Sequence, residues 1–219
     1  MAAVLRGAAL SVLLQQFARL PVPGRVKTRM QPVLSAEQAC ALHEALVLWT
    51  SRRLLQAGLG TVELWAAGGV DHPLFRRCLG EGVSQICLQR GDDLGDRMQY
   101  ALASGLRRAA AVLLVGSDCP EIDAGYLRAA TRALQHVDLV LGPALDGGFV
   151  LIGVRRPVSD GVFTNVRWGS ETVLEETLNG AQAAGYSVQL LTALQDIDRP
   201  EDLPAWEGLQ ATVDPAVRR

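Results

Sequence analysis

The chain has 219 residues, of which 49% are hydrophobic and 20% charged, and its 21 basic and 23 acidic residues give a formal net charge of −2. This length and composition suit one globular domain with a buried core. We therefore expect a single domain over residues 1–219, with a loose tail at 212–219. The charge gives no electrostatic reason to expect nucleic acid or an anionic membrane as a partner.

The cysteines and histidines argue against several kinds of site. The four cysteines are widely spaced and include no Cys-x-x-Cys pair, which is typical of a protein in the reducing cytosol without disulfides or structural zinc. The three histidines are isolated, so no Ser-His-Asp triad is favoured. The apolar run Ala8–Leu14 is too short to cross a bilayer and lacks a small-residue cleavage site. We expect it to form the first strand of a cytoplasmic protein.

Short apolar runs alternate along the chain with helical patterns. Strands are expected at residues 9–15, 61–67, 83–88, 112–115, 137–141, 149–154 and 187–191. Helices are expected from the capping box Ser35–Gln38 to Gly58, at 71–79, from the polar loop 91–98 through 108, at 123–135, at 170–184 and after Pro200. The alternation predicts an α/β fold, a three-layer α/β/α sandwich with a mixed, mainly parallel sheet.

A basic loop follows the first predicted strand. The residues from Phe17 to Met30 contain two prolines and a glycine, which predict irregular structure. Four cations, Arg19, Arg25, Lys27 and Arg29, lie in this stretch. Gly24 allows the backbone to approach a ligand, and Arg and Lys can neutralise phosphate oxygens. The loop therefore predicts a di- or triphosphate clamp, the alternative being a solvated basic loop; it matches neither a Walker A motif nor a Gly-x-Gly-x-x-Gly fingerprint.

Acidic residues follow several predicted strands. Asp118 comes directly after the apolar run that ends in Gly116, where open α/β sheets bind ligands. Asp146 lies in a tight Asp-Gly-Gly turn, and Asp196 and Asp198 follow the last strand. Mg²⁺ is typically held by one or two carboxylates and substrate phosphates. The alternative is that Asp118 only turns the chain or caps the next helix, and that Asp146 only forms a turn.

Five stretches together resemble one family. These are Phe17–Arg29, Asp93–Met98, Gly116–Pro120, Gly142–Gly153 and Asp196–Leu203. In this order they are similar to the DUF2064 family, also called radical-SAM/selenodomain-associated transferase 1, over residues 12–203. The resemblance implies the GT-A fold of the nucleotide-diphospho-sugar transferase superfamily, and a more distant similarity to the guanylyltransferases that act on 2-phospholactate and the molybdenum cofactor.

The resemblance also implies roles for individual residues. Lys27, Arg29 and Asp118 would be catalytic, and Asp118 and Asp198 would hold Mg²⁺ or Mn²⁺. The remaining positions divide into a nucleotide- and phosphate-binding set (Pro23, Gly24, Arg25, Lys27, Arg29 and Ser117) and a substrate set (Asp146, Gly147, Gly148 and Trp168). The residues Leu145, Phe149 and Gly169-Ser170 depart from the family pattern, so the acceptor is less defined than the nucleotide.

The expected function is transfer of a sugar from a nucleotide-diphospho-sugar to a small-molecule acceptor. The basic loop carries more cations than a sugar nucleotide needs, which keeps nucleotidyl transfer, with pyrophosphate leaving, as an alternative. The third possibility is a nucleotide-binding protein without catalytic activity. No role follows from the residues for the loop Asp93–Met98, which either orders over the ligand or only caps its helix. Trp49, Trp65 and Met98 are expected in the core, and Cys119 is expected to be a small buried residue rather than a nucleophile.

Overall fold

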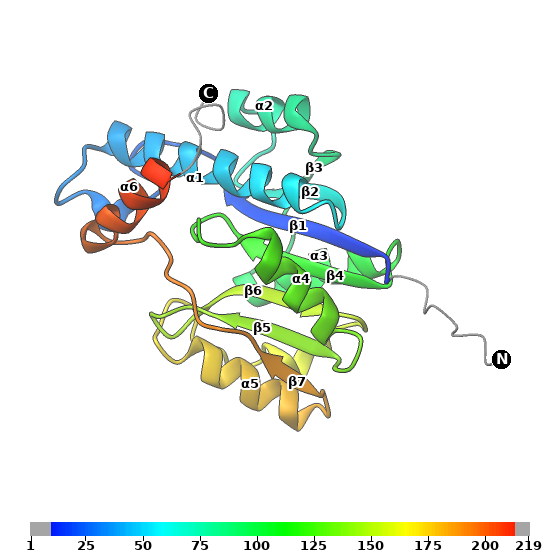
Figure 1. Cartoon of the computed structure of the whole chain (residues 1–219). Coiled ribbons are helices and arrows are strands. Elements are labelled where there is room, and N and C mark those ends of the chain that lie inside the picture. Colours follow the sequence, from blue (N-terminus) through cyan, green and yellow to red (C-terminus); the bar gives the residue numbers. More distant parts are fainter. Residues whose placement is uncertain (1–9, 213–219) are drawn as a thin grey trace.

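The structure, a computed structural model, describes residues 10–212 and contains a seven-stranded mixed sheet (Figure 1). The strand order is β3-β2-β1-β4-β6-β5-β7. The strands are β1 (Val12–Arg19), β2 (Gly60–Ala67), β3 (Gln85–Leu88), β4 (Ala111–Gly116), β5 (Leu139–Pro143), β6 (Phe149–Val154) and β7 (Val188–Leu190). Only β6 runs antiparallel to its neighbours in this sheet, which confirms the prediction of a mixed, mainly parallel sheet.

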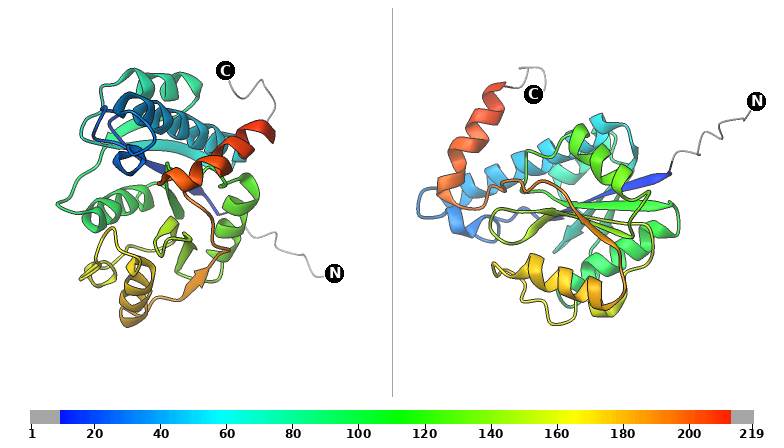
Figure 2. Two further views of the ribbon diagram at one scale, coloured as in Figure 1. Left: turned by 90° about the vertical axis from the view of Figure 1, so that its left-hand side faces the viewer. Right: turned by 60° about the horizontal axis from the view of Figure 1, so that its bottom comes forward.

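Helices cover both faces of the sheet. The helices are α1 (Ala36–Ala57), α2 (Pro73–Glu81), α3 (Leu94–Leu106), α4 (Ala124–Ala133), α5 (Val173–Ala183) and α6 (Leu203–Thr212), with short 3-10 turns at Thr28–Met30, Asp160–Val162 and Pro200–Asp202. One core cluster joins α1, α2 and α4 to one face of the sheet, and a second joins α3 and α5 to the other. Figure 2 shows these layers edge-on, with α6 outside α1. The predicted three-layer α/β fold is confirmed.

Local sequence signals account for several of these elements. The β1 strand is buried from Val12 to Ala18 because it lies between β2 and β4 in the middle of the sheet. The capping box of α1 is confirmed, since the Ser35 hydroxyl accepts from the Gln38 N–H and the Gln38 side chain accepts from the Ser35 N–H. Gly58 ends the helix at φ 62°, a conformation that glycine adopts without strain.

The prediction was wrong about some boundaries. The first strand begins at Val12 and continues to Arg19, so Phe17 and Arg19 belong to the sheet rather than to the basic loop. Pairing with β2 along its whole length holds these residues extended. Helix α3 begins at Leu94, inside the predicted polar loop, because the Asp93 side chain caps it. The expected start of the first strand at residue 9, and the tail after 212, lie outside the described residues.

The buried tryptophans support the expected core. Trp49 and Trp65 are buried, as are Met98 and Cys119, and burial raises the pKa of the Cys119 thiol to about 12. Trp49 packs edge-on against Trp206, in a third cluster that attaches α6 to α1. Within residues 10–212, no helix is long and apolar enough to cross a bilayer.

Candidate functional site

A cavity of about 660 Å³ opens where the parallel strands end. Arg19 pairs with Ala67 and Phe17 with Gly116, so β1, β2 and β4 finish at the same edge of the sheet. After β1 the chain turns towards β2, whereas β4 lies on the other side of β1. Such a switch in strand order leaves a crevice at the carboxyl ends of the strands, which is where open α/β sheets bind ligands.

The basic loop enters this cavity through Lys27. Its backbone has φ 48° and ψ 39°, a left-handed conformation that is uncommon for a residue other than glycine. The side chain is 3% exposed, and its ammonium lies 2.7 Å from Asp118 Oδ1 and 3.8 Å from Asp198 Oδ1. It also donates a hydrogen bond to the carbonyl of Ile197. Lys27 therefore joins two segments that hold the predicted metal ligands.

The arginines of the basic loop are more exposed than Lys27. Arg29 Nη1 donates to Asp198 Oδ2 at 2.7 Å, with the Arg29 side chain 51% exposed. Arg25 lines the cavity and makes no salt bridge with any acidic residue in the described part of the chain. Pro23 and Gly24 shape the loop, with φ 77° at Gly24, but they do not line the cavity.

Asp118 is held by its backbone as well as by its side chain. Its carbonyl accepts from the N–H of Ile197 at 2.8 Å, and its side chain is 48% exposed. The residue that caps the following helix is Asp123, whose carboxylate accepts from the Tyr126 N–H, so Asp118 does not serve as that cap. Burial acts to raise the pKa of Asp118, but attraction and hydrogen bonding to the Lys27 ammonium outweigh it and leave the pKa below its ordinary value.

A third carboxylate lies close to this pair. Burial raises the pKa of Asp196 to about 6, and repulsion from Asp146, Asp118 and Asp198 adds to the shift. The acids that follow different predicted strands are therefore near enough to interact. Their mutual repulsion is the electrostatic condition that favours a cation between them.

The donor set fits a divalent ion in part. Asp118 and Asp198 present carboxylate oxygens, the ligands that Mg²⁺ and Mn²⁺ prefer, and both side chains are partly exposed to the cavity. Within residues 10–212, no three acidic, cysteine or histidine side chains are arranged to hold a metal ion by themselves. Two carboxylates suffice only if substrate oxygens and water complete the coordination, which is the usual arrangement for Mg²⁺.

Ser117 lines the cavity, but its hydroxyl is already hydrogen-bonded within the protein. It is 3% exposed, and its hydroxyl donates to the Phe17 carbonyl at 2.7 Å and accepts from Gln16 Nε2 at 2.9 Å. The Gln16 amide in turn accepts from the Ser51 hydroxyl. In this structure the Ser117 hydroxyl is thus engaged in a buried network that ties β1, β4 and α1 together.

The turn between β5 and β6 forms the other side of the cavity. Asp146 Oδ1 accepts from the Gly148 N–H at 2.9 Å and closes this turn. Gly147 has φ 91°, and a Cβ there would lie 2.0 Å from the carbonyl oxygen of Glu171, so only glycine fits. Trp168 packs against Phe149 and Phe163, with ring centroids 6.5 and 5.8 Å apart. Asp146, Gly148 and Trp168 line the cavity, whereas Gly147 only shapes the turn.

Sequence reasoning assigned no function to several residues in the cavity wall. Leu94, Arg97 and Met98, from the loop without a predicted role, all line it. So does His43 from α1, whose Nε2 lies 3.0 Å from the Arg19 carbonyl and whose pKa is lowered by burial. Arg97 could have been found from the sequence, because it is the one basic residue in the stretch Asp93–Met98. No sequence pattern marks His43, because only the packing of α1 beside the end of β1 brings it to the cavity.

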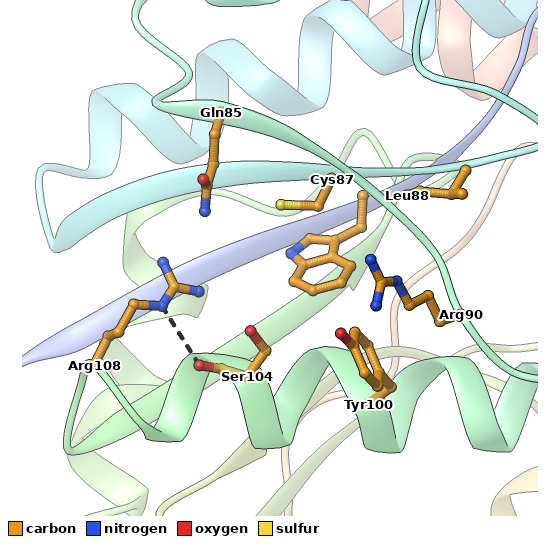
Figure 3. A pocket seen from close by; sticks show the side chains of 8 residues that line it. Gln85, Cys87, Leu88, Arg90, Tyr100, Ser104 and Arg108 are labelled. Carbon is orange, nitrogen blue, oxygen red and sulfur yellow. Dashed lines mark hydrogen bonds between the residues drawn. The ribbon is translucent and has the colours of Figure 1, made fainter.

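A second hollow of about 400 Å³ lies between β3 and α3 (Figure 3). Trp65 and Tyr100 meet in it edge to face, and Arg90 lies over the Tyr100 ring at 5.4 Å. Arg108, at its other end, is bound by the buried carboxylate of Glu63. It contains none of the predicted site residues, so the cavity at the strand ends is the candidate site.

The fold and this cavity define the class to which the protein belongs. A mixed α/β/α sandwich with its cavity at the strand switch is the GT-A-like architecture of nucleotide-diphospho-sugar transferases and nucleotidyltransferases. Residues 50–170 match the family described as "Uncharacterized protein conserved in bacteria (DUF2064)", and the chain belongs to this family. The matched range includes Asp118, Asp146 and Trp168 but neither the basic loop nor Asp198.

Solved structures of other proteins share this fold. A candidate nucleotide-diphospho-sugar transferase from Desulfovibrio desulfuricans G20 superposes with a TM-score of 0.81 at 28% identity, over 94% of this chain and 90% of that one. The 4-diphosphocytidyl-2C-methyl-D-erythritol synthase of Anaerococcus prevotii DSM 20548 superposes with a TM-score of 0.62 at 10% identity, over 93% of this chain and 100% of that one. The manganese complex of Rv0371c from Mycobacterium tuberculosis H37Rv superposes with a TM-score of 0.51 at 16% identity, over 93% of this chain and 100% of that one. No curated protein matches the chain.

Proposed function

We propose that the protein is a metal-dependent transferase that uses a nucleotide-activated substrate, with transfer of a sugar from a nucleotide-diphospho-sugar to a small-molecule acceptor as the main candidate. One observation carries this proposal. The cavity at the strand switch has the basic loop beside two carboxylates, Asp118 and Asp198, that share one lysine. Mg²⁺ is usually bound by one or two carboxylates together with substrate phosphates, and Arg and Lys side chains neutralise phosphate oxygens, so this combination suits a diphosphate.

Each part of the site has a chemical task in this reaction. Asp118 and Asp198 would hold Mg²⁺ or Mn²⁺, which when bound supplies positive charge to the phosphate oxygens. Arg25 and Arg29 can neutralise further phosphate oxygens as charge develops on the leaving group. Lys27 orients both carboxylates through its contacts with them. Asp146, Gly148 and Trp168, with the turn that Gly147 permits, would form the acceptor side.

The similar proteins support the coarser part of the proposal, a nucleotide-using transferase. The D. desulfuricans protein is described as a candidate nucleotide-diphospho-sugar transferase, and the A. prevotii protein is named as a diphosphocytidyl synthase. The Rv0371c structure contains manganese. The A. prevotii and Rv0371c proteins are less than 25% identical to this chain, so they support only the shared fold. The manganese in the Rv0371c structure makes Mn²⁺ a reasonable test condition for this chain.

Nucleotidyl transfer is the second candidate, and one observation favours it. Arg19 and Arg25 line the cavity without a salt bridge to any acid among residues 10–212, in addition to the paired Lys27 and Arg29. Unpaired guanidinium groups suit the three phosphates of an NTP better than the two of a sugar nucleotide. A non-catalytic nucleotide-binding protein would bind the same ligands without turnover.

Thermal-shift measurements test the proposal directly. The melting temperature is measured with UTP, GTP, CTP, UDP-glucose and a GDP-sugar, each with and without Mn²⁺. At a hundredfold excess over the Kd, a bound nucleotide is expected to raise it by about 5–10 °C, because binding adds about 2.7 kcal/mol to stability. A preference for NTPs followed by pyrophosphate release would indicate nucleotidyl transfer. The absence of any shift under all conditions would refute the transferase proposal.

The variant Asp118→Asn tests the metal assignment. Replacing the carboxylate with an amide of equal size is expected to abolish the part of the shift that depends on Mn²⁺. Asp123→Asn is the matched control, because asparagine caps a helix about as well as aspartate and Asp123 caps α4. An unchanged Mn²⁺-dependent shift in Asp118→Asn would show that Asp118 is not a metal ligand.

A further inference from the structure

The loop Gly91–Asp93 is folded tightly onto the first turn of α3. Gly91 has φ 137°, and a Cβ there would lie 2.4 Å from the Cβ of Asp96. Asp93 Oδ1 accepts from the Asp96 N–H at 2.8 Å, and Asp96 Oδ2 accepts from the Asp92 N–H at 3.2 Å. Two of the three carboxylates in this stretch are therefore committed to backbone N–H groups.

In this arrangement the Arg97 guanidinium is held by a backbone carbonyl but is not paired with a carboxylate of the described residues. Its Nε donates to the Gly91 carbonyl at 3.1 Å, which fixes the guanidinium plane. Although Asp92, Asp93 and Asp96 are its neighbours in sequence, Arg97 makes no salt bridge in the part of the chain that the structure describes. The residue is partly buried and lines the cavity of the candidate site. A guanidinium fixed through Nε keeps its two terminal nitrogens free for a bidentate oxyanion.

The wall of the same cavity has a second donor without an acceptor. The indole N–H of Trp168 is buried and has no hydrogen-bond partner among the described residues. Trp168 packs against the start of α3, where a Cβ on Gly95 would lie 2.9 Å from the indole ring. Buried donors without acceptors are uncommon in folded proteins and call for an explanation such as a ligand.

We propose that Arg97 binds an anionic group, a phosphate or carboxylate, of the second substrate, so that the cavity has two anion subsites. The first subsite is formed by the basic loop and would take the nucleotide phosphates, and the second is formed by Arg97 at the start of α3. This inference rests on the proposed function for the identity of the first ligand. It narrows the acceptor to molecules that carry an oxyanion.

The test is an equilibrium titration with inorganic phosphate, and separately with acetate, followed by ligand NMR. Arg97→Gln is expected to remove one class of phosphate or acetate site and weaken binding there by about tenfold or more, because a charged hydrogen bond is lost. Arg25→Gln is expected to weaken the other class. Arg107→Gln is the matched control, since Arg107 caps the far end of the same helix. It is expected to bind both anions as the unmodified protein does.

Nucleotide affinity separates this inference from the proposed function. Arg97→Gln should bind the nucleotide found in the thermal-shift panel within about twofold of the unmodified protein. Loss of nucleotide affinity in Arg97→Gln, or anion binding equal to that of Arg107→Gln, would overturn the second subsite. If no nucleotide binds but Arg97→Gln still loses an anion site, the proposed function fails and the anion subsite stands. Arg97→Lys keeps the charge and is expected to retain part of the binding, which excludes misfolding as the cause.

Discussion

Lys27 is the residue on which the geometry of the site depends. Its ammonium reaches Asp118, Asp198 and the Ile197 carbonyl from a left-handed backbone position. Backbone strain of this kind costs about 1–3 kcal/mol and persists where surrounding contacts outweigh it. Here the three oxygen contacts supply that compensation. They also keep a cation beside the two carboxylates, which would otherwise repel each other.

Lys27→Met should therefore lower the free energy of unfolding. We expect a loss of about 1–3 kcal/mol, less than for a fully buried pair because the Asp118 side chain is 48% exposed to solvent. Urea denaturation measures it. Arg29→Met, which breaks an exposed pair, should cost less than about 1 kcal/mol. If the double variant Lys27→Met/Asp118→Asn lost as much as the two single changes summed, Lys27 and Asp118 would not be coupled.

At the scale of elements, the β5–β6 turn is shaped by its contact with the start of α5. Gly147 approaches the Glu171 carbonyl too closely for any side chain, and its carbonyl accepts from the Leu174 N–H. The turn thereby places Asp146 and Gly148 at the cavity. The helix and the turn come from separate parts of the chain, so the site depends on their packing.

Gly147→Ala tests this packing. The substitution is expected to cost about 3 kcal/mol or more, because it adds a backbone clash to the strain of a positive φ. Gly169→Ala is the matched control, since Gly169 has φ 85° but open space around its missing Cβ. It should cost only about 1 kcal/mol. Equal losses in thermal unfolding of the two variants would mean that the contact with Glu171 contributes nothing.

At the scale of the whole molecule, a buried carboxylate joins three segments at one end of the sheet. Glu63 in β2 accepts from both terminal nitrogens of Arg108, from Gln85 of β3 at 2.5 Å and from the Trp65 indole at 3.2 Å. Burial acts to raise the pKa of Glu63, but these hydrogen bonds outweigh it and hold the pKa below its ordinary value. The charged form is therefore favoured by folding.

Because of this group, the free energy of unfolding should decrease as the pH is lowered. A carboxyl whose pKa is lowered by folding contributes stability above its unfolded pKa, and this contribution is lost as the pH falls through the folded value. Glu63→Gln should cost about 2 kcal/mol at pH 7, and the cost should shrink below about pH 4. Urea unfolding at both pH values measures it. Glu176→Gln, which breaks the surface pair with Arg167, should cost less than Glu63→Gln, and a pH-independent cost at Glu63 would contradict this account.

Much of the architecture follows from the sequence alone. The buried apolar runs, the Ser35 capping box and the strand-end position of Asp118 depend on local patterns, and the structure confirms them. Boundaries were less accurate where tertiary pairing decides them, as at Arg19, which β2 holds in the sheet. The roles of the predicted site residues stay predictions, although most of those residues line one cavity.

Only the tertiary structure decided which charged groups meet. From the sequence, Lys27 and Asp118 were separate candidates for phosphate and metal, whereas in the fold they form one ion pair. Ser117 likewise became part of a buried network, and Arg97 became a cavity cation that forms no salt bridge among the described residues. The physical reason is that local propensity and hydrophobic pattern are properties of short segments. A contact between charged side chains from distant segments depends on sheet register and helix packing, which no single segment contains.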